Sequence, residues 1–221
     1  MSDLCVFTRG DDLTLLRQSC EHVMITLQTF DCKWTDYVDV KLRKAIDFIN
    51  TRPEPFMMWV DGHDSLVLKP EDEILARLSA AGNTVMISGE TNCYPDADRA
   101  KDYHKKHNNH YLITNQPAYI CAGCWIGPKH QLLTTLHTVL GCAKDGDDQR
   151  AWTTAYLADM LPDVQIDHAR RSFASVGDGQ TALNSDACIK HWNGRCPGRQ
   201  DYYNLLYNLV EGTGFYGRGL E

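Results

Sequence analysis

Short apolar runs recur along the chain and alternate with segments of a different periodicity. Buried strands are predicted where such runs span four to eight residues and end at polar or glycine residues. The longer ones are Leu4–Thr8, His22–Leu27, Phe56–Val60, Thr84–Ser88 and Ile120–Gly127. Two shorter runs, Val164–Ile166 and Ala187–Lys190, are predicted as late strands. Continuous rather than alternating apolar runs are typical of parallel sheets that helices cover on both faces.

Between these runs, apolar residues recur at helical spacing. Leu13, Leu16 and Cys20 predict a helix over Asp11–Cys20. One face of a second helix is formed by Val38, Leu42, Ile46 and Ile49, which leaves Lys41, Arg43 and Lys44 on its other sides. Further helices are predicted over residues 70–81, 132–141, 147–161 and 202–210. Strands that alternate with helices imply an α/β sandwich with a mostly parallel central sheet.

The segment from Gly89 to Tyr119 lacks a sustained period, which is uncommon at this length unless the segment is functional or contains short elements. Basic residues gather within it, interleaved with Tyr103 and Tyr111. They are Lys101, His104, Lys105, Lys106, His107 and His110. A solvated surface helix or loop is the simpler interpretation, and a local basic binding face is the alternative.

Length and composition favour one domain over residues 1–211, followed by a glycine-rich, flexible tail over 212–221. The net charge of −7 disfavours a broad, nonspecific nucleic-acid binder. No apolar run is long enough to span a membrane, and the N-terminal residues do not resemble a signal peptide. Nine cysteines, an odd number, are then best read as reduced thiols. We therefore expect a cytoplasmic protein without a membrane partner.

Two polar clusters follow predicted strands directly. Asp61-Gly62-His63-Asp64 comes after Phe56–Val60, and His191-Trp192-Asn193-Gly194 comes after Ala187–Lys190. Ligands of open α/β sheets bind beyond the carboxyl ends of the strands, so the two clusters can meet in one crevice. Two carboxylates and one imidazole, completed by diphosphate oxygens, suit Mn²⁺. An ordinary turn and a structural histidine are the simpler alternatives.

A third acidic cluster, Asp145-Gly146-Asp147-Asp148-Gln149, opens the helix predicted over 147–161. A carboxylate pair here can orient an acceptor hydroxyl, or stabilise positive charge that develops on a sugar ring. Alternatively, Asp147 and Asp148 only complement the positive end of the helix dipole.

Cys121 and Cys124 form a CxxC pair, which with Cys188 and Cys196 would make a zinc site or by itself a redox pair. The wide 188/196 spacing and the continuation Trp125-Ile126-Gly127 favour a core strand instead. The chain has no GxGxxG after its first strand, no GxxxxGK[ST] loop and no GxSxG elbow. Dinucleotide oxidoreductases, P-loop proteins and α/β-hydrolases therefore lose their main support.

From Leu4 to Arg199 the ordered motifs resemble the glycosyltransferase domain of the procollagen-lysine hydroxylases and their viral relatives. Ser88–Pro95 is similar to the family's Ser-x-Glu-x-x-Cys-aromatic-Pro segment, with Tyr94 in place of the usual Trp. Ala122–Gly127 is similar to its small-Gly-aromatic-Ile-Gly strand. The resemblance implies a GT-A-type, Rossmann-like α/β sandwich that binds a UDP-sugar through Mn²⁺ or Mg²⁺.

The resemblance also implies roles for individual residues. The metal ligands would be Asp61, Asp64 and His191, and the residues required for transfer Asp147, Asp148 and Gln149. Residues that would contact the donor are Thr8 beside the uridine, Trp34, Lys41, Asp61, Asn193, and Tyr94 within a mobile lid over 89–119. The chain departs from the family at His63, where relatives carry an aromatic residue that stacks near the uracil.

The implied reaction moves a hexose, glucose by preference, from a UDP-sugar to a hydroxyl of a macromolecular acceptor. The acceptor would be a hydroxymethylated pyrimidine in DNA or hydroxylysine in a collagen-like protein. Since no signal sequence or hydroxylase domain accompanies the motifs, we expect a phage or microbial enzyme. The basic residues of 101–110 favour DNA, whereas the overall acidity opposes it; on balance we expect hydroxymethylated DNA, with hydroxylysine as the alternative. A noncatalytic module that binds a metal or sugar nucleotide, and a structural zinc protein, are the rival hypotheses.

Overall fold

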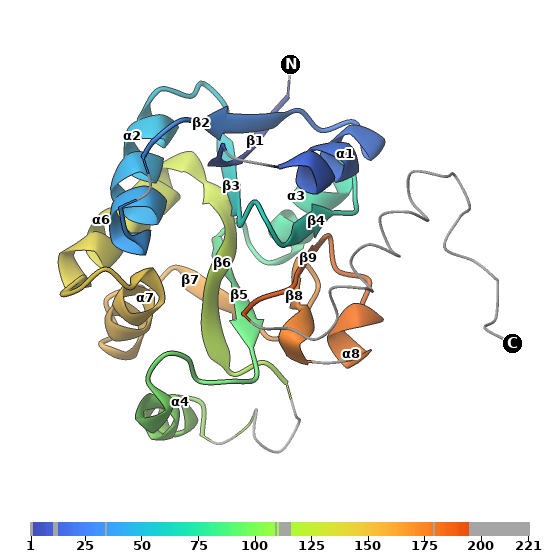
Figure 1. Ribbon diagram of the computed structural model, residues 1–221. Coiled ribbons are helices and arrows are strands. Elements are labelled where there is room, and N and C mark those ends of the chain that lie inside the picture. Colours follow the sequence, from blue (N-terminus) through green and yellow to red (C-terminus); the bar gives the residue numbers. More distant parts are fainter. Residues whose placement is uncertain are drawn as a thin grey trace, which may run out of the picture.

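A computed structural model describes residues 2–10, 13–33, 35–108, 110, 116–178 and 180–194. Its main sheet has six strands in the order β2-β1-β3-β6-β5-β7 (Figure 1). They are β1 (Leu4–Arg9), β2 (Leu27–Phe30), β3 (Phe56–Val60), β5 (Val85–Glu90), β6 (Tyr119–Pro128) and β7 (Val164–Asp167). Strand β6 runs antiparallel to its neighbours β3 and β5, and the remaining pairs are parallel. The predicted α/β sandwich with a mostly parallel sheet, as in a GT-A-type fold, is confirmed.

Helices cover both faces of this sheet. On one face lie α2 (Ala45–Asn50), α6 (Lys129–Cys142) and α7 (Asp148–Leu157), and on the other α1 (Thr14–His22) and α3 (Glu71–Ala80) (Figure 1). Strand β3 is apolar throughout because its side chains are buried on both faces of the sheet. Met57 and Trp59 pack into the core under the first set of helices, whereas Met58 and Val60 pack under the second. Side chains of a strand alternate between faces, and here both faces are buried.

A second, smaller sheet has the order β4-β9-β8, formed by β4 (Ser65–Val67), β9 (Ile189–His191) and β8 (Phe173–Ser175). Two short helical elements, η3 (Val176–Asp178) and α8 (Gln180–Leu183), connect β8 to β9. Strand β9 lies slightly later than the predicted run Ala187–Lys190, so that His191 is its last residue rather than the residue after it.

The prediction of a strand over His22–Leu27 is wrong. Helix α1 continues to His22, and Met24 follows with a positive φ of 60° and a side chain that is 89% exposed. Parallel pairing with β1 begins only at Leu27, opposite Val6. The helix predicted over 147–161 also ends early, at Leu157, with Asp159 in the left-handed region at φ 56°.

A π-helix, η1 (Asp39–Lys44), precedes α2 and changes which side chains face the core. The predicted apolar face is buried, but Val40 and Lys41 are buried too, so the expectation that Lys41 lies on an outer side is wrong. A π-helix bonds residue i to i+5 instead of i+4, so side chains within it depart from the 3.6-residue spacing. That departure turns Lys41 toward the ends of the sheet strands.

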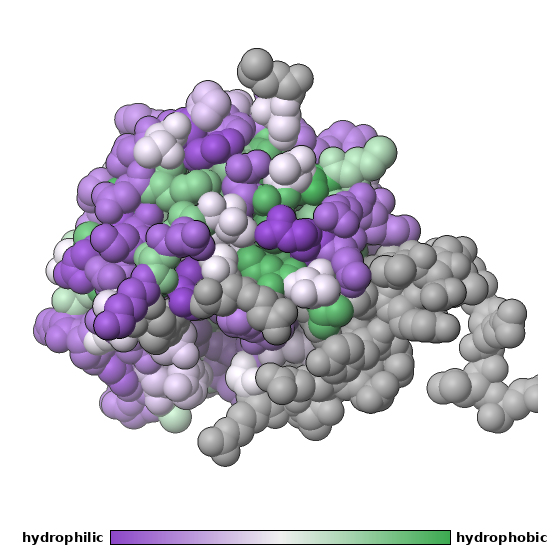
Figure 2. Space-filling model, turned by 45° about the horizontal axis from the view of Figure 1, so that its top comes forward, coloured by the Kyte–Doolittle hydropathy of each residue, from purple (hydrophilic) through white to green (hydrophobic). Residues whose placement is uncertain are grey.

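In the described part of the aperiodic segment after β5 lie two short helices, η2 (Ala97–Arg99) and α4 (Ala100–Lys106). Tyr103 of α4 is buried, with its hydroxyl 3.0 Å from Thr153 Oγ1 of α7. The helix predicted over 202–210 and the tail over 212–221 lie outside the described residues. On the face shown in Figure 2, hydrophilic residues predominate and hydrophobic residues form small patches between them. None of the described helices has the length and apolar content needed to cross a membrane.

Candidate functional site

A cleft of about 570 Å³ lies where the ends of β3 and β5, the middle of β6, the start of α7 and the end of β9 meet. Most of the site residues predicted from sequence line it: Lys41, Asp61, Asp64, Tyr94, Asp147, Asp148, His191 and Asn193. Thr8 lines an adjoining pocket instead. Trp34 lies outside the described residues.

Two carboxylates and one imidazole come together in this cleft. Ligand atoms of Asp61, Asp64 and His191 all lie within 4.8 Å of one another. His191 Nε2 is 3.4 Å from Asp64 Oδ1 and 3.8 Å from Asp61 Oδ2. Backbone pairing brings them together, because Trp192 N donates to Asp64 O at 2.8 Å and Asp61 N donates to Gly123 O at 2.9 Å. Oxygen and imidazole ligands at this spacing fit Mn²⁺ or Mg²⁺.

The imidazole of His191 reaches the carboxylates across the backbone of β6. A Cβ at Gly123 would lie 2.1 Å from His191 Cε1, so this position requires glycine. Burial disfavours the imidazolium, but the charge of Asp64 and the neighbouring Cys121 raise the pKa of His191 well above its usual value. Burial likewise opposes ionisation of Asp64, yet His191 and then Lys41 hold the pKa of its carboxyl below the usual value.

Asp61 is held by two further donors. Trp59 Nε1 donates to Oδ1 at 3.0 Å, and Lys41 Nζ donates to Oδ2 at 2.8 Å. The same Lys41 nitrogen lies 3.7 Å from Asp148 Oδ2. Burial disfavours the ammonium, but Asp148 and Asp61 together raise the pKa of Lys41 above its ordinary value. Lys41 thus joins the candidate metal ligands to the acids of α7.

The two acids at the start of α7 differ in environment. Asp147 is the N-cap residue, and its Oδ1 accepts from Arg150 N at 2.9 Å. Asp148 is buried, and its Oδ2 has no hydrogen-bond partner among the described residues. Burial raises the pKa of Asp148 to about 6, although Lys41 opposes the shift. The helix-capping interpretation therefore describes Asp147, while Asp148 lines the cleft as a buried acid without a capping role.

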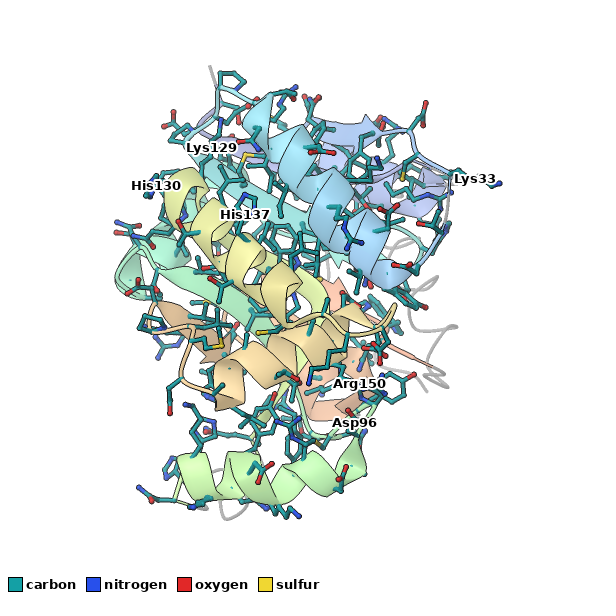
Figure 3. The ribbon with its side chains drawn as sticks, turned by 90° about the vertical axis from the view of Figure 1, so that its left-hand side faces the viewer. Lys33, Asp96, Lys129, His130, His137 and Arg150 are labelled. Carbon is teal, nitrogen blue, oxygen red and sulfur yellow. The ribbon has the colours of Figure 1, made fainter. Side chains whose placement is uncertain are left out.

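An ion pair fixes the start of α7 against the segment after β5. Arg150 and Asp96 point toward one another in Figure 3, with Nε 2.7 Å from Oδ2 and Nη2 3.0 Å from Oδ1. The hydrogen bond from Arg150 holds the pKa of Asp96 below its usual range. This paired contact between planar groups gives the acids of α7 a defined position relative to Tyr94.

Glu90, at the end of β5, is a site residue to which sequence reasoning gave no role. It is buried and accepts hydrogen bonds from Gln149 Nε2 at 2.6 Å and Asn193 Nδ2 at 2.7 Å. Gln149 Oε1 in turn accepts from Ala122 N at 3.1 Å. Glu90 therefore links α7, β6 and the segment after β9. The sequence pattern that predicted Asp61 as a site residue, a carboxylate at the end of an apolar strand, could also have predicted Glu90.

The adjoining pocket, of about 350 Å³, lies beside the candidate metal ligands. Thr8, Gly62 and His63 line it, and it shares Tyr37, Lys41, Asp61 and Asp64 with the main cleft. Thr8 is buried at the end of β1, whereas His63 is exposed. Two pockets therefore meet at Asp61 and Asp64.

The CxxC cysteines lie within β6, as the core-strand interpretation predicts. Cys121 Sγ lies 3.6 Å from His191 Nδ1, and Cys124 Sγ lies 3.8 Å from Ser65 Oγ. Among the described residues, the group suited to a metal ion consists of Asp61, Asp64 and His191, and no cysteine belongs to it. Cys196 lies outside the described residues.

Comparisons of the sequence with known proteins point to one family. Residues 38–214 match the model of a family described as the PLOD GT domain. The human multifunctional procollagen lysine hydroxylase and glycosyltransferase LH3 is 25% identical over 179 residues, which cover 78% of this chain and 22% of that protein. The rat protein of the same name matches equally over 179 residues at 25% identity. A Drosophila melanogaster procollagen-lysine,2-oxoglutarate 5-dioxygenase is 29% identical over 116 residues, 52% of this chain and 15% of that protein.

The chain thus spans about a fifth of the length of the mammalian relatives. The match to the family model covers most of the chain, including the three candidate metal ligands and the acids of α7. The resemblance seen in the sequence motifs is confirmed. This chain belongs to the family of PLOD glycosyltransferase domains.

Proposed function

We propose that this glycosyltransferase moves a hexose from a UDP-sugar to a hydroxyl group of a macromolecular acceptor, and that it depends on a divalent metal ion. The observation that carries the proposal is the single cleft in which Asp61, Asp64 and His191 face the acids of α7. A module that only binds a metal or sugar nucleotide needs the three candidate metal ligands, but it does not need a buried acid such as Asp148 beside them.

Asp61, Asp64 and His191 would hold the Mn²⁺ or Mg²⁺ ion, which when bound neutralises charge on the departing diphosphate. Asp148, with a pKa of about 6, is largely ionised at neutral pH. In that state it can accept the proton of an acceptor hydroxyl, or stabilise positive charge on the sugar ring. Lys41, 3.7 Å from Asp148, keeps that buried carboxylate paired before the substrates arrive.

The two pockets support an orientation for the donor. The nucleobase would occupy the pocket of Thr8 and His63, and the sugar would extend into the main cleft toward Asp148. His63 would then set how tightly this protein holds uracil, because it replaces the stacking aromatic of the family. Asn193 and the exposed Tyr94 line the sugar side of the cleft, where Tyr94 would cover the donor.

For the acceptor, the relatives favour hydroxylysine, because the mammalian ones are named as both procollagen lysine hydroxylase and glycosyltransferase. The preference for hydroxymethylated DNA depended on the basic residues of 101–110, most of which lie in α4. Several of these make contacts within the protein: His104 Nε2 lies 2.6 Å from Tyr119 Oη, and Lys106 pairs with Asp159. Lys101 and Lys105 remain exposed for phosphate contacts. Hydroxylysine is therefore our first choice and DNA the second.

The test measures UDP release from each UDP-sugar, with and without Mn²⁺, against a hydroxylysyl peptide and against hydroxymethylated DNA. We expect Mn²⁺-dependent release with one acceptor, and a loss of more than about 100-fold in Asp61→Asn. Asp47→Asn, which changes an exposed carboxylate of α2, is the matched control and should retain activity. Full activity of Asp61→Asn, or metal-independent release, would refute the proposal. Donor binding without turnover on any acceptor would favour the noncatalytic module.

A further inference from the structure

The His191 ring has a second polar neighbour, on the side away from the carboxylates. Cys121 Sγ lies 3.6 Å from Nδ1, while Nε2 is 3.4 Å from Asp64 Oδ1. Cys121 is buried in β6, at 2% exposure, and lines the cleft. Among the described residues it is the hydrogen-bond partner that the structure gives to Nδ1. The imidazole thus bridges a thiol and the two carboxylates.

The ring has little freedom to choose another arrangement. The His191 backbone is fixed by pairing of β9 with β4, opposite Ser65, and with β8, opposite Ser175. The absent side chain of Gly123 leaves space that the ring itself fills. What remains is rotation of the ring about its own bond, which decides which nitrogen faces the carboxylates. A hydrogen bond at Nδ1 is the contact that can select one rotation.

A hydrogen bond at Nδ1 also determines the protonation pattern of the ring. A histidine that binds a metal through Nε2 carries its proton on Nδ1, and that N–H needs an acceptor. A cysteine sulfur can accept, although weakly. If Sγ accepts from Nδ1–H, the Nε2 lone pair points at the space between Asp61 and Asp64.

We propose that Cys121 is a positioning residue of the metal centre, whose Sγ accepts a hydrogen bond from His191 Nδ1 and thereby presents Nε2 to the cation. The inference rests on the metal dependence in the proposed function. It assigns to Cys121 no contact with donor or acceptor. Removal of such outer partners typically weakens metal binding by roughly 10- to 100-fold.

The experiment measures the dissociation constant of Mn²⁺ alone, from the electron paramagnetic resonance signal of free Mn²⁺. Cys121→Ala removes the acceptor, whereas Cys121→Ser keeps one. The matched control is Cys5→Ala, which removes another buried thiol, also 2% exposed, from strand β1. We expect Cys121→Ala to weaken Mn²⁺ binding by about 10-fold, Cys121→Ser by less than about 3-fold, and Cys5→Ala to leave it unchanged. Melting temperatures are measured for each, and Cys121→Val serves if the alanine variant does not fold.

The inference is overturned if Cys121→Ala, or Cys121→Val in its place, binds Mn²⁺ as tightly as the unchanged chain. It is also overturned if the serine variant loses as much affinity as the alanine variant. Its failure can be told apart from that of the proposed function by Asp61→Asn. If the unchanged chain binds Mn²⁺ no better than Asp61→Asn does, both fail. If Asp61→Asn weakens binding and Cys121→Ala does not, only the role of Cys121 fails.

Discussion

At the scale of single residues, Asp148 couples the chemistry of the cleft to the stability of the fold. It is buried, its Oδ2 has no hydrogen-bond partner among the described residues, and its pKa is raised to about 6. In the unfolded chain the same carboxyl has its ordinary pKa, near 3.8. Between these two values the folded state binds the proton more tightly than the unfolded state. The stabilising contribution of the neutral carboxyl is therefore lost as the pH rises through about 6.

Replacement of Asp148 by Asn should consequently stabilise the protein at pH 8 while abolishing turnover. We expect the free energy of unfolding to rise by about 3 kcal/mol at pH 8 and by only about 1 kcal/mol at pH 4.5, where Asp148 is protonated in the folded state but mostly ionised in the unfolded chain. Urea denaturation at the two pH values measures this, with Asp47→Asn as the exposed control. If the variant is less stable than the unchanged chain at pH 8, the attraction between Lys41 and the charged Asp148 outweighs the cost of burying that charge.

How far single residues could be predicted depended on how local their signal was. Asp61, Asp64 and His191 follow or end strands, so the rule that strand ends form the crevice was enough to bring them together. Glu90 ends β5 and offered the same signal, whereas Cys121 lies inside β6 and offered none; the contacts of both were not predictable. The partners of Glu90 lie 59 and 103 residues away in the chain, and that of Cys121 lies 70 residues away. Local sequence patterns do not indicate which residues so far apart in the chain come into contact.

At the scale of elements, the long apolar runs were the easiest to predict from the sequence. The runs that became β3, β5 and β6 were long and apolar enough to be recognised. Strands β4 and β8 have three residues each and exist because they pair with β9. The π-helix η1 breaks the 3.6-residue period, so the inward turn of Lys41 could not be read from helical spacing.

Asp167, at the end of β7, connects the two sheets. Its carboxylate accepts hydrogen bonds from the backbone N–H of Arg171 at 3.1 Å, Ser172 at 2.6 Å and Phe173 at 2.8 Å. These bonds turn the chain from the main sheet into β8. Asp167→Ala should lower the free energy of unfolding by about 3 kcal/mol, because three backbone donors lose their partner. Urea denaturation provides the measurement.

Asp163→Ala is the control for this element, since Asp163 is exposed and its backbone oxygen, which accepts from Val85 N, is unchanged. We expect it to alter stability by less than about 0.5 kcal/mol. Because β8 pairs with β9, which carries His191, Asp167→Ala should weaken Mn²⁺ binding as well. Equal stability of the two variants would mean that the β7–β8 turn holds its shape without the carboxylate.

At the scale of the whole molecule, the candidate metal ligands lie where the two sheets meet. Asp61 follows β3 of the main sheet, Asp64 precedes β4 of the small sheet, and His191 ends β9. A cation that binds all three connects the sheets, and the diphosphate of a donor adds ligands to the same cation. Binding to the folded state alone should therefore stabilise the protein as a unit.

We expect Mn²⁺ and UDP together to raise the melting temperature by more than the sum of their separate effects. At a UDP concentration 100 times its dissociation constant the gain is about 2.7 kcal/mol, or roughly 5 to 10 °C for a chain of this size. Differential scanning fluorimetry with Mn²⁺, UDP, both, and both with a chelator measures it. Asp61→Asn should lose the joint effect, while Asp47→Asn should keep it. Additive shifts would mean that UDP binds without the help of the cation, and the metal centre would then not serve donor binding.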